Sequence, residues 1–172
     1  MEKMLTMHIA EPADAPALAE LAAKTFFDTY AAFNTAEDMD HYITNHFNVS
    51  KIEQEIAHPG TLLLIVRING AMAGYAKLLE GHVPDVPENA ALEISRFYVD
   101  RPFQSKGIGR RLMAEIWAIA ESSGCTAVWL GVWQRNQRAI EIYTRLGFRI
   151  TGTTTFQLGS DLQEDFVMIK YL

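Results

Sequence analysis

The sequence predicts one α+β domain over residues 1–172, and three observations support this prediction. Apolar runs with strand character flank Asn69-Gly70, the dipeptide most typical of a tight β-hairpin turn. Other stretches carry apolar residues at intervals of three and four, the spacing of one helix face. The chain has no internal repeat, low-complexity segment or linker, and 172 residues suit a single domain.

The part of the chain before residue 90 is expected to form a strand, three helices and the hairpin. Asp14 can cap the first helix, and Thr35 with Asp38 partly matches a capping box for the second. The expected strands are 4–10, 61–68 and 71–80. The first two expected helices begin at residues 14 and 35, and the third covers 50–57. Residues 81–89 contain two prolines and are expected to form a loop that borders a substrate site.

The part after residue 90 alternates strands and helices. The segment 126–133 is apolar on both faces, as a central strand covered on both sides would be. The helix expected at 105–123 carries an apolar stripe and ends at Gly124. The remaining expected elements are strands at 90–99, 148–156 and 166–171, a helix at 134–146 and a turn at 159–161.

The composition and the cysteine count indicate the cellular compartment. Hydrophobic residues make up 49% and charged residues 21%, which are ordinary globular values. The single cysteine, Cys125, excludes a disulfide framework and is more typical of a buried structural thiol than of a nucleophile. The sequence shows no signal-peptide pattern and no apolar run of membrane-spanning length. We therefore expect a cytoplasmic protein without a membrane partner.

Charge is distributed unevenly along the chain, whose net charge is −6. Residues 1–95 carry 5 basic and 14 acidic side chains, whereas residues 96–149 carry 9 basic and 4 acidic ones. The basic segment suits a phosphate-bearing cofactor, and the acidic remainder either attracts a cationic substrate or serves solubility. The overall charge, with no basic run among aromatic residues, argues against nucleic acid as a partner.

A glycine-rich turn lies at the centre of the basic segment. It reads Gln104-x-x-Gly107-x-Gly109, follows the strand at 90–99 and precedes the helix expected at 105–123. Glycine lets the backbone approach an anion closely, and a helix start offers unpaired N–H groups and a positive dipole end. Such a turn is consistent with a phosphate cradle, although a glycine pair alone is more often only a tight turn.

A second pattern follows one strand later. It reads Asn136-x-x-Ala139-Ile140-x-x-Tyr143-x-x-Leu146-Gly147-Phe148. The two patterns, in this order, resemble the coenzyme A loop and last helix of the GNAT superfamily of N-acetyltransferases. The resemblance implies acetyl-CoA as co-substrate. The residues that it assigns to the coenzyme are Phe97, Tyr98, Val99, Gln104, Ser105, Lys106, Gly107, Ile108, Gly109, Arg110, Asn136 and Tyr143.

The resemblance spans nearly the whole chain and carries an expectation about its architecture. It implies a three-layer α+β fold, with helices on both faces of a mixed, mostly antiparallel seven-stranded sheet. Strands 90–99 and 126–133 would splay apart and admit the pantetheine arm. Oligomerisation as a homodimer is expected by analogy only.

Acetyl transfer to an amine needs a base, an acid and a donor for the carbonyl oxygen. An alkyl ammonium with a pKa of ~10.4 is only about one part in 2,500 free amine at neutral pH. By resemblance Glu93 is the candidate base, although it could instead pair with Arg96 while water takes the proton. Tyr143 would protonate the departing thiolate, and main-chain N–H groups near 97–99 would stabilise the oxyanion.

Metal chemistry has no support in the sequence. The five histidines lack ligand spacing such as His-x-x-x-His, so no metal site is predicted. They are His8, His41, His46, His58 and His82.

The acceptor is less well defined. Residues 26–30, 34–39 and 158–165 resemble the bacterial branch that includes polyamine (spermidine/spermine) acetyltransferases. By that resemblance the acceptor-binding residues are Phe27, Tyr30, Glu37 and Asp38. Carboxylates near aromatic rings can hold a polycation, but the same residues could simply cap helices and face solvent. Two alternatives remain, namely acetylation of a protein or peptide N-terminus and a non-catalytic module that senses coenzyme A.

Overall fold

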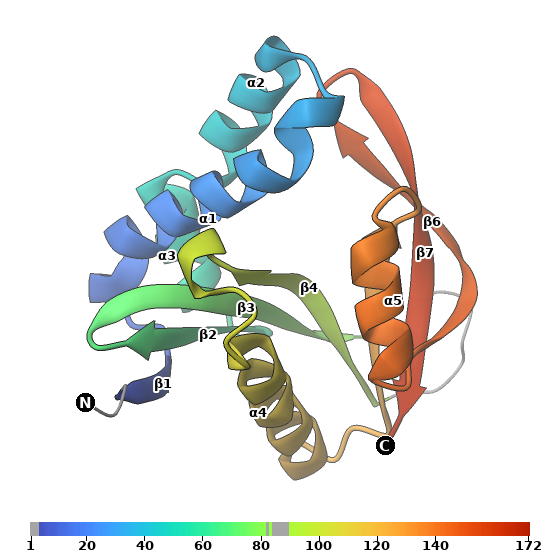
Figure 1. Cartoon of the computed structure of the whole chain (residues 1–172). Helices are drawn as coiled ribbons and strands as arrows, with labels where there is room; N and C mark the ends of the chain where they lie inside the picture. The colour runs from blue at the N-terminus through green and yellow to red at the C-terminus, as the bar shows by residue number, and fades with distance from the viewer. Residues whose placement is uncertain (1–3, 82, 84–89) are drawn as a thin grey trace.

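The computed structural model describes residues 4–81, 83 and 90–172 (Figure 1). Within these residues seven strands form one sheet in the order β1-β2-β3-β4-β5-β7-β6. The strands are β1 (Leu5–Ile9), β2 (Thr61–Ile68), β3 (Ala71–Gly81), β4 (Ala91–Val99), β5 (Ala127–Trp133), β6 (Arg149–Leu158) and β7 (Asp161–Tyr171). Every neighbouring pair is antiparallel except β4 and β5, which run parallel.

Helices cover both faces of the sheet (Figure 1). The α-helices are α1 (Ala15–Tyr30), α2 (Ala36–His46), α3 (Val49–Ala57), α4 (Ile108–Ser122) and α5 (Gln137–Arg145). Short 3-10 turns occur at Pro12–Asp14, Ala31–Phe33 and Arg101–Phe103. The first three helices pack on one face, and α4 and α5 pack on the other. The predicted three-layer α+β fold with a mixed seven-stranded sheet is therefore confirmed. None of the helices that the structure describes has both the length and the apolar character needed to span a membrane.

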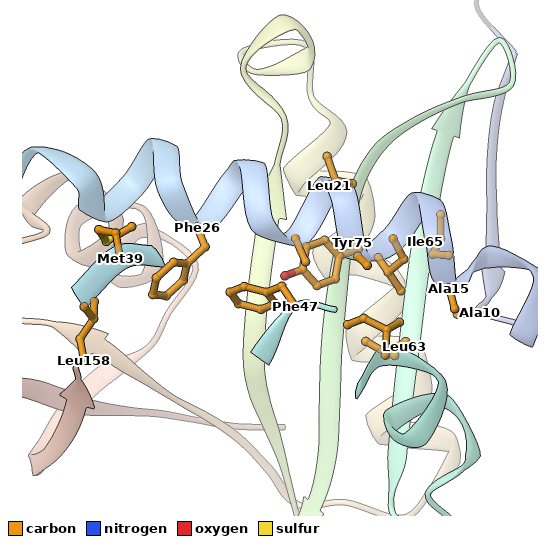
Figure 2. Close-up of a cluster of buried hydrophobic side chains, with 14 residues drawn as sticks. Ala10, Ala15, Leu21, Phe26, Met39, Phe47, Leu63, Ile65, Tyr75 and Leu158 are labelled. Atoms are coloured by element: carbon orange, nitrogen blue, oxygen red, sulfur yellow. The ribbon is translucent and has the colours of Figure 1, made fainter. Parts of the chain in front are cut away.

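The core between α1–α3 and the sheet is rich in aromatic rings (Figure 2). Phe26 of α1 stacks on Tyr42 of α2 with their ring centroids 4.6 Å apart, and it contacts Phe47 at 5.2 Å. Tyr75 of β3 is fully buried beneath these helices. Burying each large apolar side chain contributes about 1.5–3 kcal/mol, so this cluster fixes α1 and α2 against the sheet.

The strands β4 and β5 pair over only three residues. Their parallel register runs from Ala91 opposite Ala127 to Glu93 opposite Trp129, and beyond that point the strands diverge. Figure 1 shows β4 leaning away from the group formed by β5, β7 and β6. The predicted splay is confirmed. A bulge at Ser95 accompanies it, since Ile94 pairs with Leu78 and Arg96 with Lys77; such bulges bend a strand and increase its twist.

Several boundaries differ from those predicted. Helix α4 starts at Ile108 rather than at 105, because Ser105 (φ 61°) and Gly107 (φ 77°) adopt left-handed backbone conformations. Helix α5 starts at Gln137 rather than at 134, because Asn136 is its N-cap. Strand β7 starts at Asp161, five residues earlier than expected. Its first residues form a largely polar ribbon with β6, so an apolar run does not reveal them. Most of the loop predicted at 81–89 lies outside the described residues.

A buried ion cluster joins α3 to β3 and β4 next to the bulge. The Glu55 carboxylate accepts hydrogen bonds from Lys77 Nζ at 2.7 Å and from both terminal nitrogens of Arg96 at 2.8 and 3.0 Å. The side chains of Glu55, Lys77 and Arg96 are only 9–13% exposed. The Arg96 guanidinium also lies over the Phe47 ring, 4.8 Å from its centroid. Arg96 therefore pairs with Glu55 and not with Glu93, the partner considered in the sequence analysis.

The charge balance of this cluster shifts the pKa of Glu55. Burial alone would raise that pKa, but the charges and hydrogen bonds of Arg96 and Lys77 outweigh burial and leave it below its usual value. A group whose pKa is lowered by folding stabilises the fold above its unfolded pKa, and this contribution is lost as pH falls through the folded value.

Replacing Glu55 by Gln should lower the free energy of unfolding at pH 7 by about 3 kcal/mol, because two buried cations lose their counter-charge. Urea denaturation measures the loss, and Glu53→Gln, an exposed change on the same helix, is the matched control. The difference between wild type and Glu55→Gln should shrink as pH falls below the usual glutamate pKa. Equal losses in the two variants would show that the cluster does not stabilise the fold.

Candidate active site

The turn from Gln104 to Arg110 presents a row of unpaired amides. None of the six backbone N–H groups from Ser105 to Arg110 donates a hydrogen bond to a residue that the structure describes. The Gln104 side chain donates to Val99 O at 2.9 Å, and Lys106 Nζ donates to Pro102 O, so the turn is tied back onto β4 and its own start. With the positive end of α4 behind them, these amides can hold a diphosphate.

Gly107 makes this arrangement possible. Its φ of 77° lies in the left-handed region, and a Cβ placed there would meet no atom within 4 Å. The position that a Cβ of residue 107 would occupy is therefore empty space next to the unpaired amides. The residues of this turn fit a coenzyme A diphosphate in donor chemistry and in access.

Beyond the split, β4 directs two amides away from β3. Asp100 N–H donates to Ala73 O at 2.9 Å, and successive residues of a strand point their N–H groups to opposite edges. Phe97 and Val99 therefore point their N–H groups toward the side from which β5 has departed. The Gln104 bond to Val99 O lies on the same edge. These amides are available to a carbonyl oxygen in the gap.

Tyr143 of α5 lies on the α4 side of the sheet. Its ring packs edge-on against Phe97 at 6.4 Å and against Phe148 at 5.7 Å between centroids. Burial, with a smaller contribution from Tyr98, raises the pKa of Tyr143 well above its usual value. The phenol therefore keeps its proton at neutral pH and can donate it. Asn136 Oδ1 accepts from Ala139 N–H at 3.1 Å, which orients the amide and leaves its Nδ2 to donate to a ligand.

The opposite face of the sheet collects polar and aromatic side chains, and we call it the α1 face. Alternation along the strands defines it, since Leu92, Ile94, Leu130 and Val132 belong to the core under α4 and α5. The side chains on the α1 face beside the split are Glu93, Tyr98, Trp129, Trp133 and Asp165, with Tyr30 of α1 above them. Tyr30 and Trp133 have ring centroids 5.9 Å apart. This face can accept protons and hold cations by cation–π contact.

The sequence-predicted acceptor residues divide into two groups. Tyr30 joins the α1 face, and burial raises its pKa well above the usual value. Phe27, 52% exposed, and Glu37 are surface residues, and in the described parts no aromatic contact joins Phe27 to that face. Asp38 is already engaged, because its oxygens accept from Ser160 N–H and Ser160 Oγ, both at 2.9 Å. The backbone hydrogen bond from Ser160 lowers the pKa of Asp38.

These bonds attach the N-terminal helices to the C-terminal hairpin. Besides Asp38 and Ser160, Gln163 Nε2 donates to Asn34 Oδ1 at 3.1 Å. The α1–α2 connection is thereby held beside the β6–β7 turn, and Figure 1 shows the two segments next to each other. Together they form one wall of the α1 face.

The residue that sequence reasoning missed is Asp165. Burial raises the pKa of its carboxyl to about 6. The signal was available, because Asp165 shares a strand face with buried Val167 and Ile169. A strand that begins at 161 rather than 166 would have placed this carboxylate inside the fold. Within the described residues, no cluster of three or more His, Cys, Asp or Glu side chains could hold a metal ion.

Comparisons with known proteins agree with this geometry. Residues 17–148 match the acetyltransferase (GNAT) family. An "uncharacterized N-acetyltransferase in pepI 3'region" of Lactobacillus delbrueckii subsp. lactis is 33% identical over 164 residues, 92% of either chain. The spermine/spermidine N(1)-acetyltransferase of Bacillus subtilis is 32% identical over 107 residues, 60% of this chain and 65% of that protein.

A solved structure supports the fold. The PaiA N-acetyltransferase of Thermoplasma acidophilum, in complex with coenzyme A, superposes with a TM-score of 0.83 at 22% identity, covering 98% of this chain and 99% of that one. The chain belongs to the acetyltransferase (GNAT) family. It is an N-acetyltransferase, and its co-substrate is acetyl-CoA.

Proposed function

We propose that this enzyme transfers the acetyl group to a primary amine of a small cationic molecule, with a polyamine as the leading candidate. The charge of the α1 face carries the proposal. Glu93 and Asp165 form no ion pair with any described residue, whereas the nearby cations Lys77 and Arg96 are both bound to Glu55. The similarity to the Bacillus spermine/spermidine enzyme, over 60% of this chain, supports the same acceptor class.

The coenzyme would lie in the gap between β4 and β5. We infer that the turn from Gln104 to Arg110 holds its diphosphate through the unpaired amides. Asn136 Nδ2 would contact the pantetheine arm, whose thioester would then lie between β4 and Tyr143. When it is bound, acetyl-CoA supplies an activated acyl group.

The chain's own groups would then perform the transfer directly, in a ternary complex. The Phe97 and Val99 amides would stabilise the charge on the carbonyl oxygen, and one such donor can contribute about 3 kcal/mol. Tyr143 would protonate the departing thiolate. Glu93 is the base predicted from sequence; burial raises its pKa, and the positive charge of Lys77 opposes that shift.

A panel of amines tests the acceptor class. Purified enzyme with acetyl-CoA should release free thiol with spermidine or spermine at least tenfold faster than with amino acids, aminoglycosides or a peptide with a free N-terminus. The panel includes a diamine, because two cationic groups are the simplest match to two carboxylates. Release with the peptide alone would favour N-terminal acetylation, and binding of acetyl-CoA with no release would favour a sensor module.

Gly107→Glu should abolish coenzyme A binding, because a carboxylate would occupy the space beside the amides and repel the diphosphate. The matched control is Gly124→Glu at the other end of α4, where φ is also positive (72°) and no atom lies within 4 Å. Both variants should lose about 1–2 kcal/mol of stability through backbone strain. Calorimetric titration with coenzyme A should show binding to the Gly124 variant only. Similar affinities for both variants would place the diphosphate elsewhere.

Tyr143→Phe should lower kcat about 10²-fold and leave the Kd for coenzyme A within about twofold. A thiolate of pKa ~8.5 leaves fairly well unaided, so activity should fall without vanishing. Steady-state kinetics and calorimetry measure the two quantities. A loss of coenzyme affinity equal to the loss in kcat would mean that the phenol supports binding instead.

We also expect the enzyme to act in the cytoplasm, consistent with its single, unpaired Cys125. The homodimer suggested by analogy remains a prediction.

A further inference from the structure

Asp165 occupies an unusual position on the α1 face. It lies on β7 opposite Trp133 of β5 and Thr154 of β6. The neighbouring β5 residue on this face, Gly131, has no side chain, and a Cβ added there would lie 3.4 Å from Asp165 Oδ2. The carboxylate therefore lies over bare backbone of β5, at the part of this strand that has already separated from β4.

No described residue neutralises this carboxylate. Asp14, Glu55 and Asp100 each pair with a cation, whereas Asp165 has neither an ion pair nor a hydrogen bond in the described parts of the chain. The titratable groups that face it are two neutral phenols, Tyr30 from α1 and Tyr98 from β4. Strands β5 and β6 contribute Gly131, Trp133 and Thr154, none of which ionises. Any ion-pair partner of Asp165 therefore comes from outside the described residues.

A second acceptor atom without a partner lies on the same strand face. Gln163 is 5% exposed, and its Oε1 receives no hydrogen bond from any described group. Its Nε2 already donates to Asn34 and Asp161, so the amide orientation that leaves Oε1 open is fixed. Residues i and i+2 of a strand are about 7 Å apart on one face. Two acceptors without a described donor, one of them buried, therefore lie on this strand face, and a ligand that carries N–H donors would suit them.

The position of Asp165 also suits proton transfer better than that of Glu93. Glu93 forms the last β4–β5 pair before the split, opposite Trp129. The charge that acts on Glu93 is Lys77, which is bound to Glu55. Asp165, in contrast, lies opposite Trp133, past the point where β5 parts from β4.

We propose that Asp165 binds the acceptor's ammonium group and takes the proton that must leave before the amine attacks. The inference rests on the amine acetylation proposed above. The ammonium N–H proton passes to the Asp165 carboxylate, and the freed amine forms a C–N bond to the thioester carbonyl carbon. When the C–S bond breaks, the thiolate takes the Tyr143 proton, and the nitrogen's second proton restores that phenol. Asp165 then releases its proton to water, so the cycle yields amide, thiol and one proton.

The pKa of Asp165, raised by burial to about 6, agrees with this role. A base is active only when deprotonated, so kcat/KM for the amine should fall as pH drops below about 6 and should level off above it. A carboxylate with an unshifted pKa would be a much weaker base at neutral pH.

Two isosteric variants and one neighbour test the assignment. Asp165→Asn should lower kcat/KM for the best amine of the panel about 10²-fold or more and abolish the acidic limb near pH 6. Glu93→Gln should keep that limb. Glu164→Gln, the same charge change one residue away on the exposed side of β7, should behave as wild type. The KM for acetyl-CoA and the melting temperature should not change, which separates chemistry from misfolding. A limb that survives in Asp165→Asn, or disappears in Glu93→Gln, would overturn the proposal.

The role of Asp165 can also be tested without turnover, by titrating its carboxyl group. If no amine of the panel is acetylated, the proposed function is rejected, and this titration still tests ammonium binding by Asp165. With ¹³C-labelled aspartate carboxyls and coenzyme A present, one resonance should titrate near pH 6 and be absent from Asp165→Asn. Saturating spermidine should move that midpoint lower, because a bound ammonium favours the carboxylate. A midpoint that spermidine leaves unchanged would overturn the assignment of Asp165 as the ammonium-binding base.

Discussion

The separation of β4 from β5 after the Glu93–Trp129 pair is the constraint on which the site depends. A parallel pair that continued would consume the Phe97 and Val99 amides in its own hydrogen bonds. Two features of β4 lie just past this pair. The bulge at Ser95 bends the strand, and Arg96 is bound to Glu55 of α3. A buried ion cluster therefore anchors β4 where the two strands part.

The two sides of the gap have complementary chemistry. On the α4 side, six amides and a helix N-terminus offer positive partial charge to an anion, and Tyr143 offers a proton. On the α1 face, Glu93 and Asp165 offer negative charge to a cation. An anionic thioester and a cationic amine can thus approach from opposite sides of one sheet without competing for the same groups. The fold thereby supports orientation, which by itself can contribute several kcal/mol to catalysis.

Much of this fold could be predicted from local patterns. Asn69-Gly70 predicts its hairpin because the turn needs positive φ, and both residues adopt it. The loop and the α5 pattern predicted the family because their spacing reflects backbone contacts that few sequences satisfy. The start of α4 was predicted three residues early, since apolar spacing does not show where left-handed residues interrupt a helix.

Long-range pairing was the part that the sequence did not disclose. The sequence places Asp38 in the capping pattern that begins at Thr35, but it does not indicate the bonds from Asp38 to Ser160, which lies 122 residues away. Likewise Glu93 and Asp165 are separated by most of the second half of the chain, and only the β4–β5–β7 order brings them to one face. The charge pattern along the chain predicts acidic residues that attract a cationic acceptor. It does not indicate which of these carboxylates are buried in the fold.

The Asn34–Gln163 and Asp38–Ser160 bonds give this fold a division of labour. Under the proposed function, the acceptor would meet a wall assembled from both ends of the polypeptide, while the acyl donor would bind to its middle. Changes at either end would then alter the acceptor wall and leave the turn from Gln104 to Arg110 unchanged. This division offers a physical reason why one scaffold can serve acceptors of different shape without reinventing its use of the acyl donor.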